Sequence, residues 1–440
     1  MRREVNGYVT SVHAFQVAVA YPPTIPSPSS PTPVSAPSTP AAKAFVTNAG
    51  SGTFTPVNTQ SGVSGTPISV GSAPVPVVIT PGDNQLFVAN ALSNTVTPYI
   101  LSTGTSLAPI AVGKYPISMA VTPDGSRVYV ANYFDHSVTP IDTSTDTALP
   151  PITVGESCAP RAIAISPDGT KLYVANHSWT NQGYITVISL PTGVITSHIY
   201  VGGGLDALAI SPNGSTLYAA DGLNAEVYSI NLSTLAVTNI SVGQSPDSLA
   251  LTSDGSTLLV TNWASGTVSE IATSSNTVSA TYTVGPQLST IAIEPGNITA
   301  LVGVGGSGEV VPFNISTGVI GAPIERGSAP SGIAIESDPS PVASFSESGT
   351  VHGSPTLFDA SGSTSALGTI VNYSWNFGDG NTANTSTASI SHTYASAGSY
   401  TVKLTVTDSA GTSTSVTYTG QVVLNNGSSL ASTQTVVPIS

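Results

Sequence analysis

The sequence predicts an all-β fold: a seven-bladed β-propeller closed by a C-terminal strand, followed by an immunoglobulin-like β-sandwich. Three observations lead to this prediction. Two short markers recur seven times along the chain, each repeat unit holds four short apolar runs separated by turn signals, and residues 340–425 break the period. Only 7% of the 440 residues are charged, so long surface helices with Glu–Lys pairs four residues apart are not available.

The N-terminal 43 residues precede the repeats. Residues 1–20 combine Arg2 and Arg3 with a short apolar run, which indicates a signal or leader remnant. Residues 21–43 are rich in proline, serine and threonine, and repeated proline blocks both helices and sheet ladders. We therefore expect an extended tether here. No segment reaches the roughly 20 apolar residues of a membrane-spanning helix.

The repeats cover residues 44–338. A Val-Gly pair begins at 70, 112, 154, 201, 242 and 284, with Arg326-Gly327 in the seventh position. A second marker keeps the same spacing: AFVTN, LFVAN, VYVAN, LYVAN, LYAAD, LLVTN and the divergent ALVGV at 300–304. Seven copies of each marker predict seven structural units.

Each unit has the size of one propeller blade. Segments such as Thr122–Gly125 and Ser166–Gly169 place proline and glycine where a tight hairpin turn requires them. Four hairpin-linked strands in about 42 residues favour a propeller over a solenoid. The first unit lacks its first strand, and a spare copy appears at Pro330–Ile335. We expect that spare strand to complete the first blade.

Residues 340–425 are predicted to form a separate β-sandwich with Trp375 in its core, because about 85 residues of short strands have the size of an immunoglobulin-like domain. Residues 426–440 are predicted to be a flexible tail.

Both parts resemble known families. Residues 44–338, through PxxIAISPDGxxLYVAN and the Val-Gly ends, resemble the YVTN-type propeller repeats of surface-layer and other exported proteins. Residues 340–425 resemble a PKD domain through FDASGS, WNFGDG and SHTY, although Asn376 stands where the family has Asp. The combination implies an extracellular or cell-surface display or adhesion protein.

Charge and composition exclude several classes of function. The net charge of −14 would repel nucleic acid. One cysteine, Cys158, cannot form an internal disulfide, and six histidines without metal-ligand spacing predict neither a metal site nor a cofactor. Because the charge is nearly all carboxylate, most of it would vanish below about pH 4, which suits an acidic exterior; an ordinary Ser/Thr-rich exported protein is the alternative.

Nine Asn-x-Ser/Thr sequons are candidate glycosylation sites, although some are expected by chance in so Ser/Thr-rich a chain. They are Asn176, Asn213, Asn231, Asn239, Asn297, Asn314, Asn372, Asn384 and Asn426.

A binding face is predicted where the loops before the first strand and after the second strand of each blade meet. The fourth blade is the longest, and its extra residues fall in those two loops. Scarce aromatic and charged residues gather in the same loops, a composition that suits a sugar or peptide ligand; packing between blades is the alternative. The candidates are Lys114, Tyr115, Tyr133, Phe134, His136, Arg161, His177, Trp179, Asp206, Asp247 and Trp263.

No constellation of residues demands an enzyme. The leading interpretation is therefore a non-enzymatic surface protein whose propeller binds protein or glycan partners, with the PKD-like domain as spacer or adhesion module. The alternative is a lactonase-like propeller hydrolase, which would need acidic or metal-binding side chains facing the central channel. Few residues of the predicted inner strands are of that type.

Overall fold

The computed structural model describes residues 43–155, 159–178, 182–326, 329–421 and 423–440. Within these ranges the chain consists of β-strands and turns, with one 3-10 turn, η1 (Ser429–Ala431). No helix in this part of the chain is long and apolar enough to cross a membrane. The leader and tether predictions, and those for Cys158 and Trp179, lie outside the described residues.

Between Lys43 and Ile335 the described residues form seven antiparallel sheets. The first three, from the inside outward, are β31 (Pro330–Ile335), β1 (Lys43–Asn48) and β2 (Thr53–Asn58) with β3 (Val63–Ser64) and β4 (Ile68–Ser69); β5 (Pro74–Ile79), β6 (Gln85–Asn90) and β7 (Thr95–Ile100) with β8 (Thr105–Ser106) and β9 (Ile110–Ala111); β10 (Pro116–Val121), β11 (Arg127–Asn132) and β12 (Ser137–Asp142) with β13 (Thr147–Ala148) and β14 (Ile152–Thr153).

The other four sheets follow the same plan. They are β15 (Ala159–Ile165), β16 (Lys171–His177), β17 (Tyr184–Ser189) and β18 (Val194–Tyr200); β19 (Leu205–Ile210), β20 (Thr216–Asp221), β21 (Glu226–Asn231) and β22 (Val237–Ser241); β23 (Pro246–Leu251), β24 (Thr257–Asn262), β25 (Thr267–Ala272) and β26 (Thr277–Thr283); β27 (Leu288–Ile293), β28 (Thr299–Val304), β29 (Glu309–Asn314) and β30 (Glu325–Arg326).

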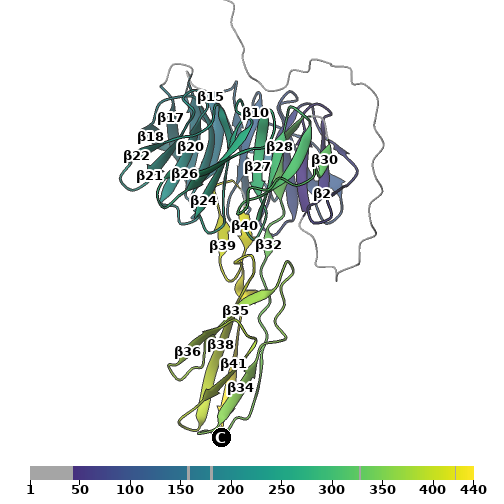
Figure 1. Ribbon diagram of the computed structural model, residues 1–440. Coiled ribbons are helices and arrows are strands. Elements are labelled where there is room, and N and C mark those ends of the chain that lie inside the picture. The colour runs from purple at the N-terminus through teal and green to yellow at the C-terminus, as the bar shows by residue number, and fades with distance from the viewer. Residues whose placement is uncertain (1–42, 156–158, 179–181, 327–328, 422) are drawn as a thin grey trace, which may run out of the picture.

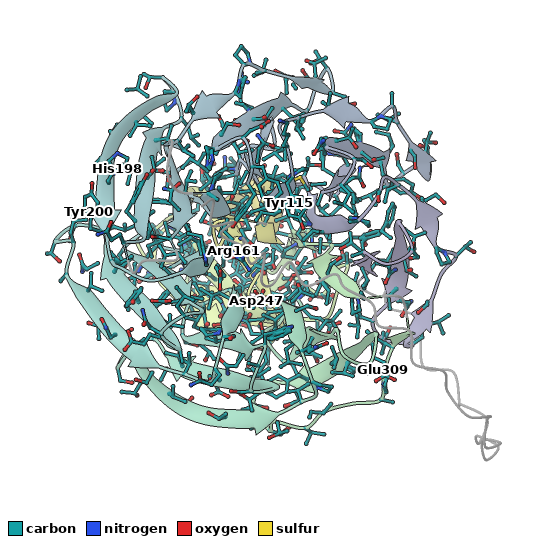
Figure 2. The ribbon with its side chains drawn as sticks, turned by 90° about the horizontal axis from the view of Figure 1, so that it is seen from above. Tyr115, Arg161, His198, Tyr200, Asp247 and Glu309 are labelled. Carbon is teal, nitrogen blue, oxygen red and sulfur yellow. The ribbon has the colours of Figure 1, made fainter. Side chains whose placement is uncertain are left out.

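The sheets stand around a common axis (Figure 2). Their innermost strands contact one another in the order β31, β5, β10, β15, β19, β23, β27 and again β31. The first sheet joins the two ends of the repeat region, because β1 pairs antiparallel with β31 and Val46 lies opposite Ile333.

The second strand of each sheet is buried on both faces, which explains the continuous apolar runs of the second marker. Strands β6 and β11 are buried along their whole length except for their first residues. Apolar clusters fill the space between neighbouring sheets; one joins Val78 and Phe87 of one sheet to Met119 and Val128 of the next. Sheet-on-sheet packing therefore holds the ring together.

The turns between first and second strands lie on one face of the ring, here called the lower face. In Thr122–Gly125 the threonine hydroxyl donates to Asp124, and Gly125 adopts a positive φ of 72°. A Cβ on Gly125 would lie 3.1 Å from Pro81 in the preceding sheet. The proline and glycine of these turns thus also pack from sheet to sheet.

The C-terminal domain hangs below this face (Figure 1). Its two sheets contain β33 (Ser346–Ser348), β34 (Pro355–Asp359) and β37 (Ser389–Thr393) in one, and β36 (Thr382–Thr385), β35 (Ile370–Asn376), β38 (Gly398–Asp408) and β41 (Ser432–Ile439) in the other. Trp375, Phe358 and Tyr394 are buried in the core, where Trp375 was expected.

The prediction of a flexible tail at 426–440 is wrong. Strand β41 pairs with β38 over eight residues, from Thr405 opposite Ser432 to Gly398 opposite Ile439. Val437 and Ile439 are buried in the domain core. The tail sequence alternates apolar and polar residues only weakly, and its partner strand supplies the rest of its stability.

A third small sheet connects the C-terminal domain to the ring. It consists of β32 (Asp338–Pro339), β40 (Val423–Asn426) and β39 (Val416–Tyr418), with β32 parallel to β40. Between β39 and β40 the chain enters the ring from below, as Figures 1 and 2 show. We call Tyr418–Gln421 the axial segment.

The axial segment is bonded to three inner strands. The backbone N–H groups of Val121, Ile165 and Ile210 donate to carbonyl oxygens of Gln421 (3.3 Å), Gly420 (2.7 Å) and Thr419 (3.1 Å), respectively. Gly420 is required here, since a Cβ would lie 2.7 Å from Ile210 Cγ2. The C-terminal domain is therefore fastened into the centre of the ring as well as joined to it through β32.

Candidate functional site

The predicted loops do meet on one face, the upper face, opposite the C-terminal domain. In the third sheet the loop after β11 bonds directly to the loop before β10: Tyr133 N donates to Tyr115 O (3.0 Å) and Phe134 N donates to Lys114 O (3.2 Å). The sixth sheet repeats the contact, because Trp263 N donates to Ser245 O at 2.8 Å.

A bulge at the upper end of each inner strand positions the charged residues. The register shifts at the second residue of the strand, which is left out of the ladder in all seven sheets. A bulge leaves one residue unpaired and re-aims its side chain. The bulged residues are Ser331, Val75, Ile117, Arg161, Asp206, Asp247 and Ser289. Arg161 and Asp247 lie near the axis of the ring (Figure 2).

Three of these side chains form a charged cluster across neighbouring sheets. Arg161 Nε lies 2.6 Å from Asp206 Oδ1, and Arg161 Nη2 lies 3.8 Å from Asp247 Oδ1. His177, at the end of β16, places Nδ1 3.1 Å from the same Asp206 oxygen. One cation is thus shared by two carboxylates while a histidine borders the pair.

Burial changes the proton affinity of this cluster. Loss of solvent raises the pKa of Asp247 to about 7, because the attraction of Arg161 only partly offsets it and Asp206 adds repulsion. Burial alone would lower the pKa of Arg161, but Asp206 and Asp247 outweigh that effect and raise it. Asp247 therefore changes charge near neutral pH.

An aromatic group lies beside the charged cluster. Ring centroids of Tyr115 and Phe134 are 5.0 Å apart, those of Tyr133 and Phe134 are 5.1 Å apart, and those of Tyr115 and Tyr133 are 6.2 Å apart. Phe134 is 53% exposed. Burial raises the pKa of both Tyr115 and Tyr133, and Arg161 is close enough to oppose the rise. Rings and charges thus form one continuous surface.

Tyr115 shows why this surface is unusual among the repeats. Its φ is 59°, a left-handed conformation that bulky side chains rarely adopt. Ala73, Ser245, Gln287 and Ala329 adopt the same conformation at equivalent positions. The turn is common to the repeat, whereas the tyrosine side chain on it occurs only in the third sheet.

The other predicted residues lie further from the cluster or outside the described residues. Lys114 is exposed, and its backbone N–H donates to Asp135 Oδ2 at 2.7 Å. His136 and Trp263 are half-buried, the former with a positive φ of 50°. Trp179 is not among the described residues. Sequence reasoning did not include Ser289 and Ser331, although alignment of the repeats would have placed them at the same bulge.

The glycosylation prediction for Asn176 is contradicted by burial. Its side chain is 0% exposed, and its amide donates to Thr186 Oγ1 at 2.8 Å. This asparagine belongs to the second marker and serves the interior of the blade. By contrast, Asn213, Asn231, Asn239 and Asn384 are exposed, and Asn297, Asn314, Asn372 and Asn426 are half-buried.

Comparison with known proteins assigns the C-terminal domain. Residues 338–423 match the family model of the PKD domain. This is a PKD domain. The matched range begins at β32, so the PKD domain includes the small sheet that carries the axial segment.

The ring resembles solved propeller structures in fold. Hydrazine synthase of Kuenenia stuttgartiensis matches with a TM-score of 0.58 at 17% identity, over 62% of this chain and 92% of that one. The periplasmic gluconolactonase of Pseudomonas aeruginosa matches with a TM-score of 0.57 at 17% identity, over 67% and 98%. A putative 6-phosphogluconolactonase of Bacteroides fragilis matches with a TM-score of 0.57 at 17% identity, over 69% and 100%. At such identity the likeness concerns the fold alone.

Proposed function

We propose that this chain is a non-enzymatic extracellular or cell-surface protein in which a closed seven-bladed, YVTN-like ring binds protein or glycan partners. The PKD domain acts as spacer or adhesion module. The observation that carries the proposal is the aromatic and charged surface at the centre of the upper face. It lies opposite the PKD domain, so a partner can approach it without meeting that domain.

The chemistry of the surface suits a polar ligand with flat or apolar faces. Tyr115, Tyr133 and Phe134 offer ring area for stacking, and the half-exposed Phe134 is accessible in the free protein. Arg161, Asp206 and Asp247 offer donors and acceptors that fix orientation. A pyranose ring or an extended peptide presents both kinds of group.

Substitution of Phe134 tests the proposal. We expect Phe134→Ala to weaken binding by about 1–3 kcal/mol while changing the free energy of unfolding by about 0.5 kcal/mol or less, since the ring is largely exposed. Binding is measured on a glycan array and by attachment to whole cells. The control is Leu235→Ala, a side chain of similar exposure (54%) in a turn on the lower face. Equal binding by both variants would contradict the proposal.

A lactonase-like hydrolase remains the second candidate, since two of the solved structures similar in fold are named as lactonases and His177, Asp206 and Asp247 gather near the axis. Acid release from gluconolactone, followed by pH-stat titration, separates the two functions. We expect no rate above that of buffer. A rate that His177→Ala and Asp206→Asn both abolish would favour the hydrolase.

A further inference from the structure

Two carboxyl groups are buried together where the PKD domain joins the ring. Asp338 of β32 is 0% exposed, and Asp408, at the end of β38, is 1% exposed. Asp338 lies opposite Asn425 in the parallel pairing of β32 with β40. Strand β40 follows the axial segment closely in sequence, so this pair lies at the base of the segment that enters the ring.

The hydrogen bonds around the pair give the two carboxyl groups different roles. Asp408 Oδ1 accepts from the backbone N–H groups of Ala410 (3.1 Å) and Thr412 (2.9 Å), and Asp408 Oδ2 accepts from Ser365 Oγ (3.2 Å). These donors favour the ionised form of Asp408. Asp338 Oδ2 accepts from Thr412 Oγ1, whereas Asp338 Oδ1 is buried and meets no donor among the described residues.

A proton on Asp338 resolves this arrangement. The side chains of Asp338 and Asp408 are hydrogen-bonded to each other, and a bond between two carboxyl groups needs one of them to donate. With the proton on Asp338, its free oxygen becomes the donor and Asp408 the acceptor. Without the proton, two buried negative charges would face each other.

The other titratable groups near the junction are mostly acidic. Glu336 precedes β32 and pairs with Lys43 of β1 at 3.8 Å, and Asp83, in the turn after β5, accepts from Ser337 N at 3.2 Å. Burial raises the pKa of Asp338 and of Asp83, to about 7 and about 6, and burial also raises the pKa of Asp408 and Glu336. Lys43 is the basic side chain in this set.

We propose that the proton shared by Asp338 and Asp408 is a latch that holds the axial segment in the ring, and that the latch opens as the pH rises. The docked state binds this proton more tightly than an undocked, hydrated carboxyl would. Docking is therefore strongest near pH 4 and below, weakens as the pH rises from about 3.8 to about 7, and levels off above that. Asp83 acts in the same direction over a lower range.

Native-state hydrogen exchange of the full chain tests the latch. Peptides that contain Ile165 and Ile210 report on docking, because these amides donate to Gly420 O and Thr419 O. After correction for intrinsic exchange rates, we expect protection to fall between pH 5 and pH 8, by up to about a hundredfold for one proton. A peptide from β28, which has no bond to the axial segment, should keep its protection.

Variants decide between the latch and other causes. Asp338→Asn can donate to Asp408 at every pH, so protection at Ile165 and Ile210 should stay high at pH 8; Asp408→Asn replaces it if the first variant fails to fold. Asp379→Asn, at a carboxylate elsewhere in the PKD domain, should keep the wild-type response. Equal protection of the wild type at both pH values, an unchanged response in Asp338→Asn, or recovery of protection at pH 8 on addition of Ca²⁺ would each overturn the latch.

Discussion

The asparagine that ends the second marker fastens three parts of a blade. In the second sheet Asn90 donates to Thr95 and Thr97 of the next strand at 3.1 and 2.9 Å, and its Oδ1 accepts from Gly71 N at 2.9 Å. Asn132 and Asn262 make the same pairs of side-chain bonds. The two sequence markers, which lie 19 residues apart, therefore meet in space.

The glycine of the Val-Gly marker is fixed by this contact. A Cβ on Gly71, Gly113 or Gly243 would lie 2.6 Å from the asparagine Cγ. The repeat thus requires glycine for close approach rather than for backbone freedom, since these glycines do not have positive φ.

Substitution of Gly113 checks this role. We expect Gly113→Ala to lower the free energy of unfolding by about 1–3 kcal/mol, because the buried Asn132 must move and its bonds to Ser137 and Thr139 are strained. Chemical denaturation measures the change. Gly398→Ala is the matched control, since its Cβ would meet only ordinary contacts at 3.5 Å. Similar losses in both variants would show that the asparagine contact is not the cause.

At the scale of elements, β31 links the two ends of the ring. It supplies partners for Ala44, Phe45, Val46 and Thr47 of β1, and Ile333 and Ile335 pack in the cluster shared with the seventh sheet. Without β31 the inner edge of β1 would be unpaired and apolar.

Two truncations test this closure. A chain ending at Gly327 lacks β31, whereas a chain ending at Ser337 keeps it, and both lack the PKD domain. We expect the shorter chain to melt lower and to self-associate through the exposed edge of β1. Thermal unfolding and light scattering give the comparison. A shorter chain that stays monomeric and melts with the longer one would rule out a role of β31 in closing the ring.

The sequence predicts these elements unevenly, for physical reasons. Continuous apolar runs and Pro-Asp-Gly turns are local signals, so the strands of the repeats could be located. The pairing of Arg161 with Asp206 and Asp247 depends on bulges and on neighbouring sheets, so only the shared face was predictable. Strand β41 and the axial segment are defined by distant partners, β38 and the inner strands, and their own residues carry little signal.

At the scale of the molecule, ring and PKD domain share buried bonds. Tyr418 is 2% exposed, and its hydroxyl reaches Val121 O (2.6 Å) and Gly420 O (2.7 Å). The sequence boundary at 340 suggested two independent domains. The docked axial segment instead couples them, so each should stabilise the other.

Calorimetry of Tyr418→Phe measures this coupling. We expect the wild-type chain to unfold with the ring and the PKD domain melting together, and the variant to lose about 1 kcal/mol as its buried acceptors lose their donor. Tyr400→Phe, which removes an exposed bond to Ser396 O, is the control and should change less. Two well-separated transitions in the wild type, unchanged by Tyr418→Phe, would mean that the domains melt independently.

The axial segment also determines how the molecule would carry a mechanical load. The chain end of the PKD domain lies far from the ring (Figure 1), so a pull on that end reaches the ring along two parallel routes. One runs through β32 into β31; the other runs through Tyr418–Gln421 into β10, β15 and β19. Because tension is divided, the strand that closes the ring bears only part of it, and three inner strands share the remainder at the centre rather than at an edge.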